Sequence, residues 1–238
     1  MRMNAWPVLL AFLVLTVLPA QASNTVTIDG VMSDWSDEFC RPDTVCDDFS
    51  NQFDAKGACI ASNWVTPGPA TTLYLRFDFD DFARSGANTQ DGCWLVDVDQ
   101  NGNVDAALCF TLANNPVTLT QTRYFSCADT TNSTCASAAE MIPVPVGTNC
   151  AVSNNVVAPD ILFSCPADTR DSGVECSVPL AAMGWTSGVI SLLRGCTFAS
   201  SQPNSNSSDC IADIGNPFTV DPEGGGNAPV ELIDFSIK

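Results

Sequence analysis

Apolar and polar residues alternate along short runs of this chain. In the run LYLRFDF, every second residue from Leu73 to Phe79 is leucine or phenylalanine, and the residues between them are tyrosine, arginine and aspartate. A period of two predicts a strand with one buried face. The same reading predicts a first strand that begins at Val26 and Ile28, and further strands over 93–98, 104–112, 117–125, 156–163, 174–178 and 188–198.

Turn residues separate these runs, and no stretch keeps the 3.6-residue period of a long amphipathic helix. Pro179–Gly184 is expected to form one helical turn that ends at the glycine. Ser, Asn, Pro and Gly dominate 199–229, which predicts loop or linker there. Many short strands and almost no helix predict an all-β fold, an antiparallel β-sandwich.

The start of the chain has the layout of an export signal. Arg2 precedes an apolar run over 8–18, and residues 19–22 are of the kind that a signal peptidase recognises. The apolar run is too short to span a bilayer comfortably. We therefore expect a signal peptide over 1–22, a β-sandwich domain over 23–220, and a Gly-rich linker plus a flexible C-terminal tail or strand over 221–238. The mature protein would be secreted, extracellular or at the cell surface, with no membrane insertion.

All twelve cysteines follow the predicted signal. An even number of cysteines in an exported chain predicts up to six disulfides. Zinc is not expected, because the chain has no C-x-x-C pair and no histidine. Cys127–Cys135 and Cys150–Cys165 are candidate pairs by their proximity in the sequence, although spacing alone does not determine connectivity.

The charge and the missing histidine exclude several functions. The chain has 27 acidic and 9 basic residues, for a net charge of −18, so it offers no basic surface to nucleic acid. Without histidine, Ser-His-Asp and Cys-His catalysis cannot occur. Two carboxylates could serve a glycosidase, but the pattern marks no pair out from the other acids. We expect no enzyme activity.

The stretch 93–110, CWLVDVDQNGNVDAALCF, reads as a hairpin centred on Asn101. Opposed residues then have numbers that sum to 202, which places Cys93 opposite Cys109. One face of the hairpin is wholly apolar, so a slip of one residue would bury aspartates. Opposed cysteines lie close enough to bond, and we predict a Cys93–Cys109 disulfide.

The tip of this hairpin spells D-x-D-x-N-G-x-x-D. Hard oxygen ligands at alternate positions around a glycine turn suit Ca²⁺, and a cation would relieve the repulsion between the carboxylates. The loop is not an EF-hand, since Leu108 stands where a bidentate glutamate belongs and no flanking helix is expected. A solvated turn without an ion is the alternative, because Asp, Asn and Gly favour turns by themselves. The predicted calcium ligands are Asp97, Asp99, Asn101, Asn103 and Asp105, completed by carbonyls or by Asp78, Asp80, Asp81 or Asp91.

The tryptophans of the mature chain have different expected roles. Trp94 lies on the apolar face of the hairpin and is expected in the core, and Trp35 is expected to close one end of the sandwich. Trp64, within the Pro- and Gly-rich SNWVTPGP, is the candidate for an exposed ring that stacks on a sugar, although aromatic rings are more often buried.

The last run, PVELIDFSIK over 229–238, alternates Ile233, Phe235 and Ile237 with polar residues. It fits a final edge strand of the same sandwich or a mobile tail. The alternative is a detachable strand that joins the sheet edge of a neighbouring subunit.

The order of these motifs is similar to that of DOMON-like and carbohydrate-binding-module-like domains of exported bacterial proteins. VTIDG followed by DW (Val26–Trp35) resembles their opening, and LYLRFDFDD (Leu73–Asp81) and LVDVDQNGNVD (Leu95–Asp105) resemble a strand and an acidic hairpin that follow. VECSVPLAAMG (Val174–Gly184) resembles their strand with a Pro-Leu turn.

The resemblance covers most of 24–198 and implies a jelly-roll or DOMON-like sandwich. It also implies a role in binding sugars, haem or other surface ligands, or in adhesion, but haem is not expected without an axial histidine. We therefore expect a secreted, non-catalytic, calcium-stabilised binding module whose partner is a surface glycan. The alternative is a structural subunit of an extracellular fibre or surface layer that self-assembles through the C-terminal strand.

Overall fold

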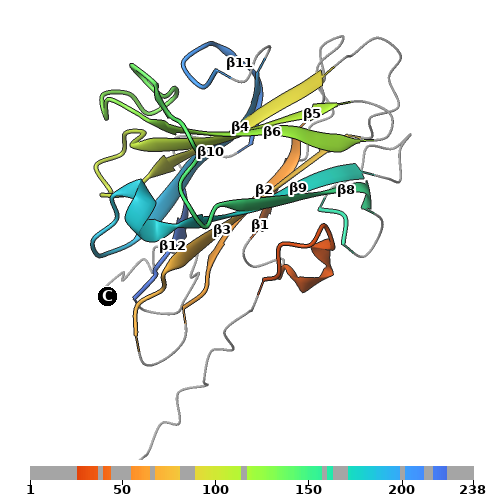
Figure 1. Ribbon diagram of the computed structural model, residues 1–238, viewed down its shortest axis with the longest axis horizontal. Coiled ribbons are helices and arrows are strands. Elements are labelled where there is room, and N and C mark those ends of the chain that lie inside the picture. The colour runs from red at the N-terminus through yellow and green to blue at the C-terminus, as the bar shows by residue number, and fades with distance from the viewer. Residues whose placement is uncertain are drawn as a thin grey trace, which may run out of the picture.

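The computed structural model describes residues 26–36, 40–43, 55–64, 68–80, 89–113, 117–156, 160–162, 171–198, 202–211 and 217–223 (Figure 1). Nearly all regular structure in this part of the chain is strand. The elements are η1 (Met32–Asp34), β1 (Cys40–Pro42), β2 (Ala55–Ser62), β3 (Thr72–Asp80), β4 (Thr89–Asp97), β5 (Ala106–Ala113), β6 (Thr118–Ser126), β7 (Ala139–Met141), β8 (Asn149–Val156), β9 (Asp171–Pro179), η3 (Leu180–Met183), β10 (Ile190–Phe198), β11 (Ser207–Ile211) and β12 (Phe218–Val220).

The strands form two antiparallel sheets that lie face to face (Figure 1). The five-stranded sheet has the order β1-β2-β3-β9-β8. The seven-stranded sheet has the order β11-β10-β4-β5-β6-β7, and β12 pairs with β10 as well. The all-β antiparallel sandwich is confirmed, and so is the helical turn at 180–183, which ends at Gly184 in the left-handed conformation (φ 79°).

The main core lies between the sheets and takes alternate residues from both. The ring of Phe77 meets those of Trp94 and Phe110 edge-on, with centroid distances of 6.2 and 5.6 Å. The indole N–H of Trp94 donates to the carbonyl of Arg76 at 3.0 Å, so its one polar group is satisfied. Gly92 pairs with Phe110, and a Cβ there would collide with the ring. Trp94 is thus a core residue, as predicted.

The outer face of the seven-stranded sheet is buried as well. Cys109, Cys93, Cys196 and Cys210 lie in one row across β5, β4, β10 and β11. They form two adjacent disulfides, Cys93–Cys109 and Cys196–Cys210, within a second apolar cluster. The loop 127–138 contributes to this cluster. A hydrogen bond from the Cys135 N–H to the Pro203 carbonyl (2.9 Å) joins it to the segment between β10 and β11.

The outer face of the five-stranded sheet is covered by the segment 26–36. Met32 and Trp35 pack there against Cys59 in a third apolar cluster. The prediction that Trp35 closes an end of the sandwich is therefore wrong. Likewise, Val26 and Ile28 begin no strand, because this segment lies across the face of a sheet instead of pairing with its edge.

Two further strand predictions need correction. The strand expected over 156–163 lies earlier, as β8, and residues 160–162 are not a strand. The segment 199–229, expected as loop, contains β11 and β12, which together cover the edge of β10.

Five disulfides join described cysteines, and none of these cysteines is free. Cys93–Cys109 and Cys127–Cys135 are confirmed. Cys150–Cys165 is wrong, because Cys150 lies directly opposite Cys176 in the β8–β9 ladder and bonds to it. The others are Cys40–Cys59 and Cys196–Cys210, and Cys46 and Cys165 lie outside the described residues.

Candidate metal-binding loop

The acidic loop 97–105 joins β4 to β5 in the predicted register. Cys93 faces Cys109 and Val96 faces Ala106, so opposed numbers sum to 202. The disulfide closes the hairpin in mid-strand, and the apolar face fills the main core. The loop therefore projects from a rigid base at one end of the sandwich.

Asp97 organises the loop through backbone hydrogen bonds. Its Oδ1 accepts from the N–H groups of Asp99 (3.2 Å) and Gln100 (2.7 Å), and its Oδ2 accepts from Gly102 (2.8 Å). Gln100 (φ 64°) and Gly102 (φ 85°) are both left-handed, which lets the chain turn tightly around this carboxylate.

Three carboxylates converge here. One oxygen each from Asp97, Asp99 and Asp105 lies within 4.8 Å of the others. Two ligands on opposite sides of a Ca²⁺ ion, at about 2.4 Å each, are about 4.8 Å apart, so one ion could contact all three. Asp99 is exposed, whereas Asp97 is only 2% exposed.

The electrostatics of the loop oppose ionisation. Burial raises the pKa of the Asp97 carboxyl above its ordinary value, against the lowering effect of its three backbone donors, and the charge of Asp99 raises it further. Burial also raises the pKa of Asp105, against the Val98 N–H, which donates to it at 2.6 Å, and the charges of Asp99, Asp129 and Asp97 add to the rise. In the described part of the chain no basic side chain pairs with these three carboxylates, and a bound cation would supply the missing charge.

The two predicted asparagine ligands have other partners. The Asn101 amide nitrogen donates to both carboxylate oxygens of Asp129 at 2.8 Å, and the Asn103 amide nitrogen donates to the Asp129 carbonyl at 3.4 Å. The Asn101 side-chain oxygen accepts from the Asn103 N–H at 2.8 Å. Of the five predicted ligands, the three aspartates converge, and the amide nitrogens of the two asparagines bind Asp129.

Asp129 was not predicted. It follows Cys127 at the start of the loop that the Cys127–Cys135 disulfide closes, and it lies in the left-handed region (φ 49°). No local pattern links it to a hairpin more than 20 residues earlier. The only signal in the sequence is the pair of nearby cysteines, which shows a closed loop but not where the loop packs.

The acids suggested to complete the site lie elsewhere. Asp78 pairs with Arg76 on the outer face of the five-stranded sheet. Asp91 is at the far end of β4 and accepts from the Thr111 hydroxyl at 2.5 Å. Asp80 ends β3 opposite Asp171, away from this loop, and residue 81 lies outside the described residues.

Trp64 lies at the same end of the sandwich as the acidic loop. It follows β2, and the nearby Ala70 N–H donates to the carbonyl of Pro222, which follows β12. β12 pairs with β10 around Ser191, whose other neighbour is Asp97. The Trp64 ring is half-buried and packs against the main core, so only part of it is open to a ligand.

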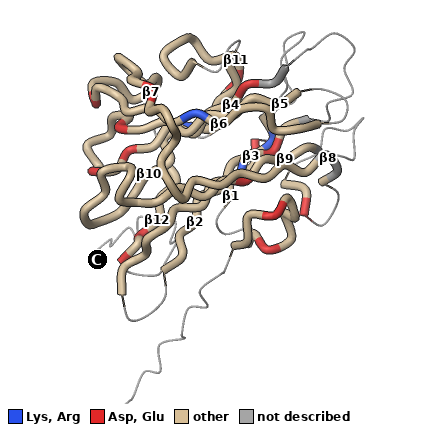
Figure 2. The backbone as a smooth tube through the Cα atoms, in the orientation of Figure 1, with Lys and Arg blue, Asp and Glu red and all other residues tan. Residues whose placement is uncertain are grey.

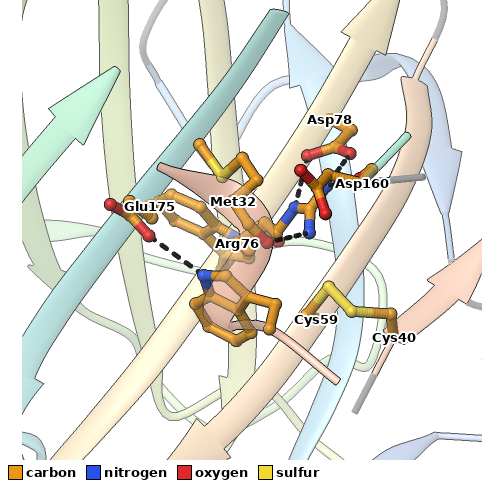
Figure 3. The surroundings of a disulfide bond; sticks show 9 residues. Met32, Cys40, Cys59, Arg76, Asp78, Asp160 and Glu175 are labelled. Carbon is orange, nitrogen blue, oxygen red and sulfur yellow. Dashed lines mark hydrogen bonds and ion pairs between the residues drawn. A yellow bond between two sulfur atoms is a disulfide. The ribbon is translucent and has the colours of Figure 1, made fainter. Parts of the chain in front are cut away.

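A second cluster of charged groups lies beneath segment 26–36 (Figure 3). The Arg76 guanidinium donates to Asp78 in a two-bond pair (2.7 and 2.5 Å), and to the carbonyls of Met32 (3.3 Å) and Asp160 (2.6 Å). Arg76 and Asp78 are both buried, and burial raises the pKa of Asp78 while the Arg76 charge lowers it.

Glu175, on β9, binds the Asp29-Gly30 turn and Trp35 of segment 26–36. Its Oε1 accepts from the N–H groups of Asp29 (2.7 Å) and Gly30 (2.5 Å), and its Oε2 accepts from the Trp35 indole at 2.9 Å. Gly30 (φ 85°) approaches the Val152 carbonyl so closely that a Cβ would lie 2.9 Å from its oxygen. The Asp29-Gly30 turn and Trp35 therefore hold segment 26–36 on the sheet through Glu175. We call the contacts that Glu175 and Arg76 make with this segment the clasp.

No family model, no curated protein and no solved structure matches this chain. The resemblance to DOMON-like domains stays a prediction from short motifs.

Within the described residues, no helix is long and apolar enough to cross a bilayer.

Proposed function

We propose that this protein is a non-catalytic module that works outside the cell, where Ca²⁺ held by the acidic loop stabilises it. The observation that carries the proposal is the convergence of Asp97, Asp99 and Asp105 on a hairpin that a disulfide braces. Five disulfides suit an oxidising compartment.

The strong negative charge supports this setting. Figure 2 marks acidic residues at many places over the described chain and few basic ones, which favours divalent cations over phosphate-rich partners. Nucleic acid and anionic membranes are therefore not among the proposed partners.

The state of the buried carboxylates supports the absence of catalysis. A catalytic acid or base needs a shifted pKa and an open approach for substrate. Asp78 and Glu175 have raised pKa values through burial, yet each is fully engaged by donors beneath segment 26–36. The pKa values of Asp97 and Asp105 are raised as well, but these carboxylates accept backbone hydrogen bonds within the loop and belong to the proposed ion site. Hydrolysis of a polysaccharide by the pure protein would contradict this part of the proposal.

Thermal unfolding tests the calcium claim. We expect EDTA to lower the Tm and excess Ca²⁺ to restore it, since an ion at 100 times its Kd stabilises the folded state by about 2.7 kcal/mol. Asp99→Asn removes one exposed ligand charge with little change in shape and should abolish most of the difference, as should Asp97→Ala with Asp99→Ala. Asp221→Asn, which changes a described acid outside the loop, is the matched control. An EDTA-insensitive Tm in the wild-type protein would contradict the proposal.

A surface glycan is the first candidate partner. The observation in its favour is that Trp64 keeps part of its ring exposed at the acidic end of the sandwich. A glycan array should then show binding that Trp64→Ala abolishes and Trp64→Phe partly retains. Binding that is unchanged in Trp64→Ala would rule out stacking on this ring.

Self-association is the second candidate, and the surface favours it more strongly. Three of the four exposed large apolar residues in the described chain lie close together in the sequence: Met141 (42%) ends β7, and Ile142 (82%) and Val146 (94%) lie in the loop between β7 and β8. Such a cluster is typical of a surface that another protein covers. We therefore favour an assembling subunit over a glycan-binding module, and sedimentation of the purified protein over a concentration series tests it.

A further inference from the structure

The outer edges of β6 and β10 are covered to different extents. β10 is nine residues long, and β12 pairs with its start while β11 pairs with its end. β6 is also nine residues long, but β7 pairs only with Tyr124, Phe125 and Ser126. No described strand pairs with that side of Thr118–Arg123, which we call the open edge.

The ladder shows which backbone groups face outwards at the open edge. The Cα atoms of Cys93 and Cys109 are 4.0 Å apart, which is typical of a non-hydrogen-bonded pair. The backbone groups of Cys109 therefore point to Arg123 on β6. The direction of the backbone groups alternates along a strand. The N–H and C=O of Thr122 therefore point away from β5, to the same side as those of Tyr124, which face β7.

The open edge lacks the features that usually prevent pairing. Exposed edges tend to carry charges or prolines, or are covered. β6, TLTQTRYFS, has no acidic residue and no proline, and its one charged residue, Arg123, lies next to the part of β6 that β7 covers and pairs with Glu140 on β7. At its start, Val117 and Leu119 pack against the main core but stay partly exposed. An added strand would complete both the ladder and the core.

We propose that a second copy of this chain donates residues 230–237, VELIDFSI, as a strand to the open edge. The idea rests on the self-association in the proposed function. Ile233, Phe235 and Ile237 would face the core beside Leu119, with Glu231 at the start of the same row, and Leu232, Asp234 and Ser236 would face outwards. Backbone hydrogen bonds supply the affinity and the alternating side chains fix the register.

The linker length favours a second copy as the donor. Val230 is seven residues beyond Glu223, the last described residue, and seven residues span at most about 25 Å. A strand added to β6 would lie five strand spacings from β12, about 24 Å in a straight line. The chain's own linker would have to run fully extended through the protein, because any route over the surface is longer.

The geometry determines the kind of assembly. The donor strand and the acceptor edge are different surfaces of the same molecule, so each copy can give one strand and receive another. Such a contact forms open filaments or closed rings, and two copies that exchange strands with each other form the smallest ring, a symmetric dimer.

Two complementary full-length variants test the proposal by sedimentation. Thr122→Pro removes the outward N–H and makes a protein that can only donate, and Thr122→Val is its matched control. Ile233→Asp with Phe235→Asp makes a protein that can only accept. We expect concentration-dependent assembly of the wild type and of Thr122→Val, monomers for each blocked variant alone, and a 1:1 dimer that grows no further when the two are mixed.

Hydrogen exchange of the wild-type protein gives a readout without substitution. The Thr122 amide should become protected as the protein assembles, and the Arg123 amide, already bonded to β5, should not change. A monomeric wild type, no dimer on mixing, or an unprotected Thr122 in the assembled state would each overturn the proposal. Assembly with an unprotected Thr122 would leave self-association standing and reject only this edge.

Discussion

Two regions of the molecule gather carboxylates in opposite ways. Beneath segment 26–36, Asp78 is paired with Arg76, and Glu175 accepts three hydrogen bonds from backbone and indole donors. In the loop 97–105, Asp97, Asp99 and Asp105 converge with no basic partner in the described chain. The first region supplies its own compensating charge and works as a clasp, whereas the second leaves room for an external cation.

Among substitutions that test this contrast, we expect one at Arg76 to change the free energy of unfolding most. Arg76→Met removes the partner of a buried carboxylate and two hydrogen bonds to backbone carbonyls, so we expect a loss of about 3–5 kcal/mol in the free energy of unfolding. Denaturant titration measures it. Arg76→Met with Asp78→Leu should recover much of the loss, because the uncompensated charge is then gone. A near-neutral single variant would show that the clasp does not depend on this pair.

A smaller effect is expected at Trp35. Trp35→Phe keeps a buried ring but leaves Glu175 Oε2 without its donor, which should cost about 1–3 kcal/mol. Trp94→Phe is a poor control because Trp94 is in the main core. Trp185→Phe, at a half-buried surface position, serves instead, because it removes an indole hydrogen bond of the same length, to the Gly188 carbonyl (2.9 Å), which is exposed so that water can replace the donor. Equal losses in Trp35→Phe and Trp185→Phe would remove the special role of the indole bond.

The smallest effect is the pH dependence of the acidic loop. The folded-state pKa values of Asp97 and Asp105 are raised, so without metal the folded state binds protons more readily than the unfolded state. Their contribution to stability is therefore greatest at acid pH, below the ordinary carboxyl pKa of about 4, and falls as the pH rises through the raised values. In EDTA, the wild type should lose Tm relative to Asp99→Asn as the pH rises above the ordinary carboxyl pKa of about 4 and through the raised values. With excess Ca²⁺ the sign should reverse, because the ion binds the ionised form. Parallel pH profiles under both conditions would contradict the assignment.

The sequence predicted the hairpin at the candidate site better than its surroundings. The register of β4 and β5 followed from the period-two pattern and the opposed Cys93 and Cys109, since only one pairing buries the apolar face. β2, AKGACIAS, was missed because it is buried on both faces and its small residues show no alternation. β11 and β12 were missed because they are short and lie in a polar segment, where pairing with β10 decides the structure.

Contacts between residues that are far apart in the sequence could not be predicted from local patterns. The Cys150–Cys176 bond depends on the register of β8 with β9, which no local pattern gives. The Asp129 contact with Asn101 depends on how a disulfide-closed loop packs. The same holds for Glu175, whose role as the partner of the Asp29-Gly30 turn is visible only once β9 lies beneath segment 26–36.

Calorimetric titration of the metal-free protein with Ca²⁺ tests the central claim most directly. We expect one ion bound per chain in the wild type and in Asp221→Asn, and strongly weakened binding in Asp99→Asn. Saturable binding of one ion that depends on Asp99 would establish the loop as the metal site. No heat of binding in the wild type at millimolar Ca²⁺, with no accompanying rise in Tm, would contradict the account.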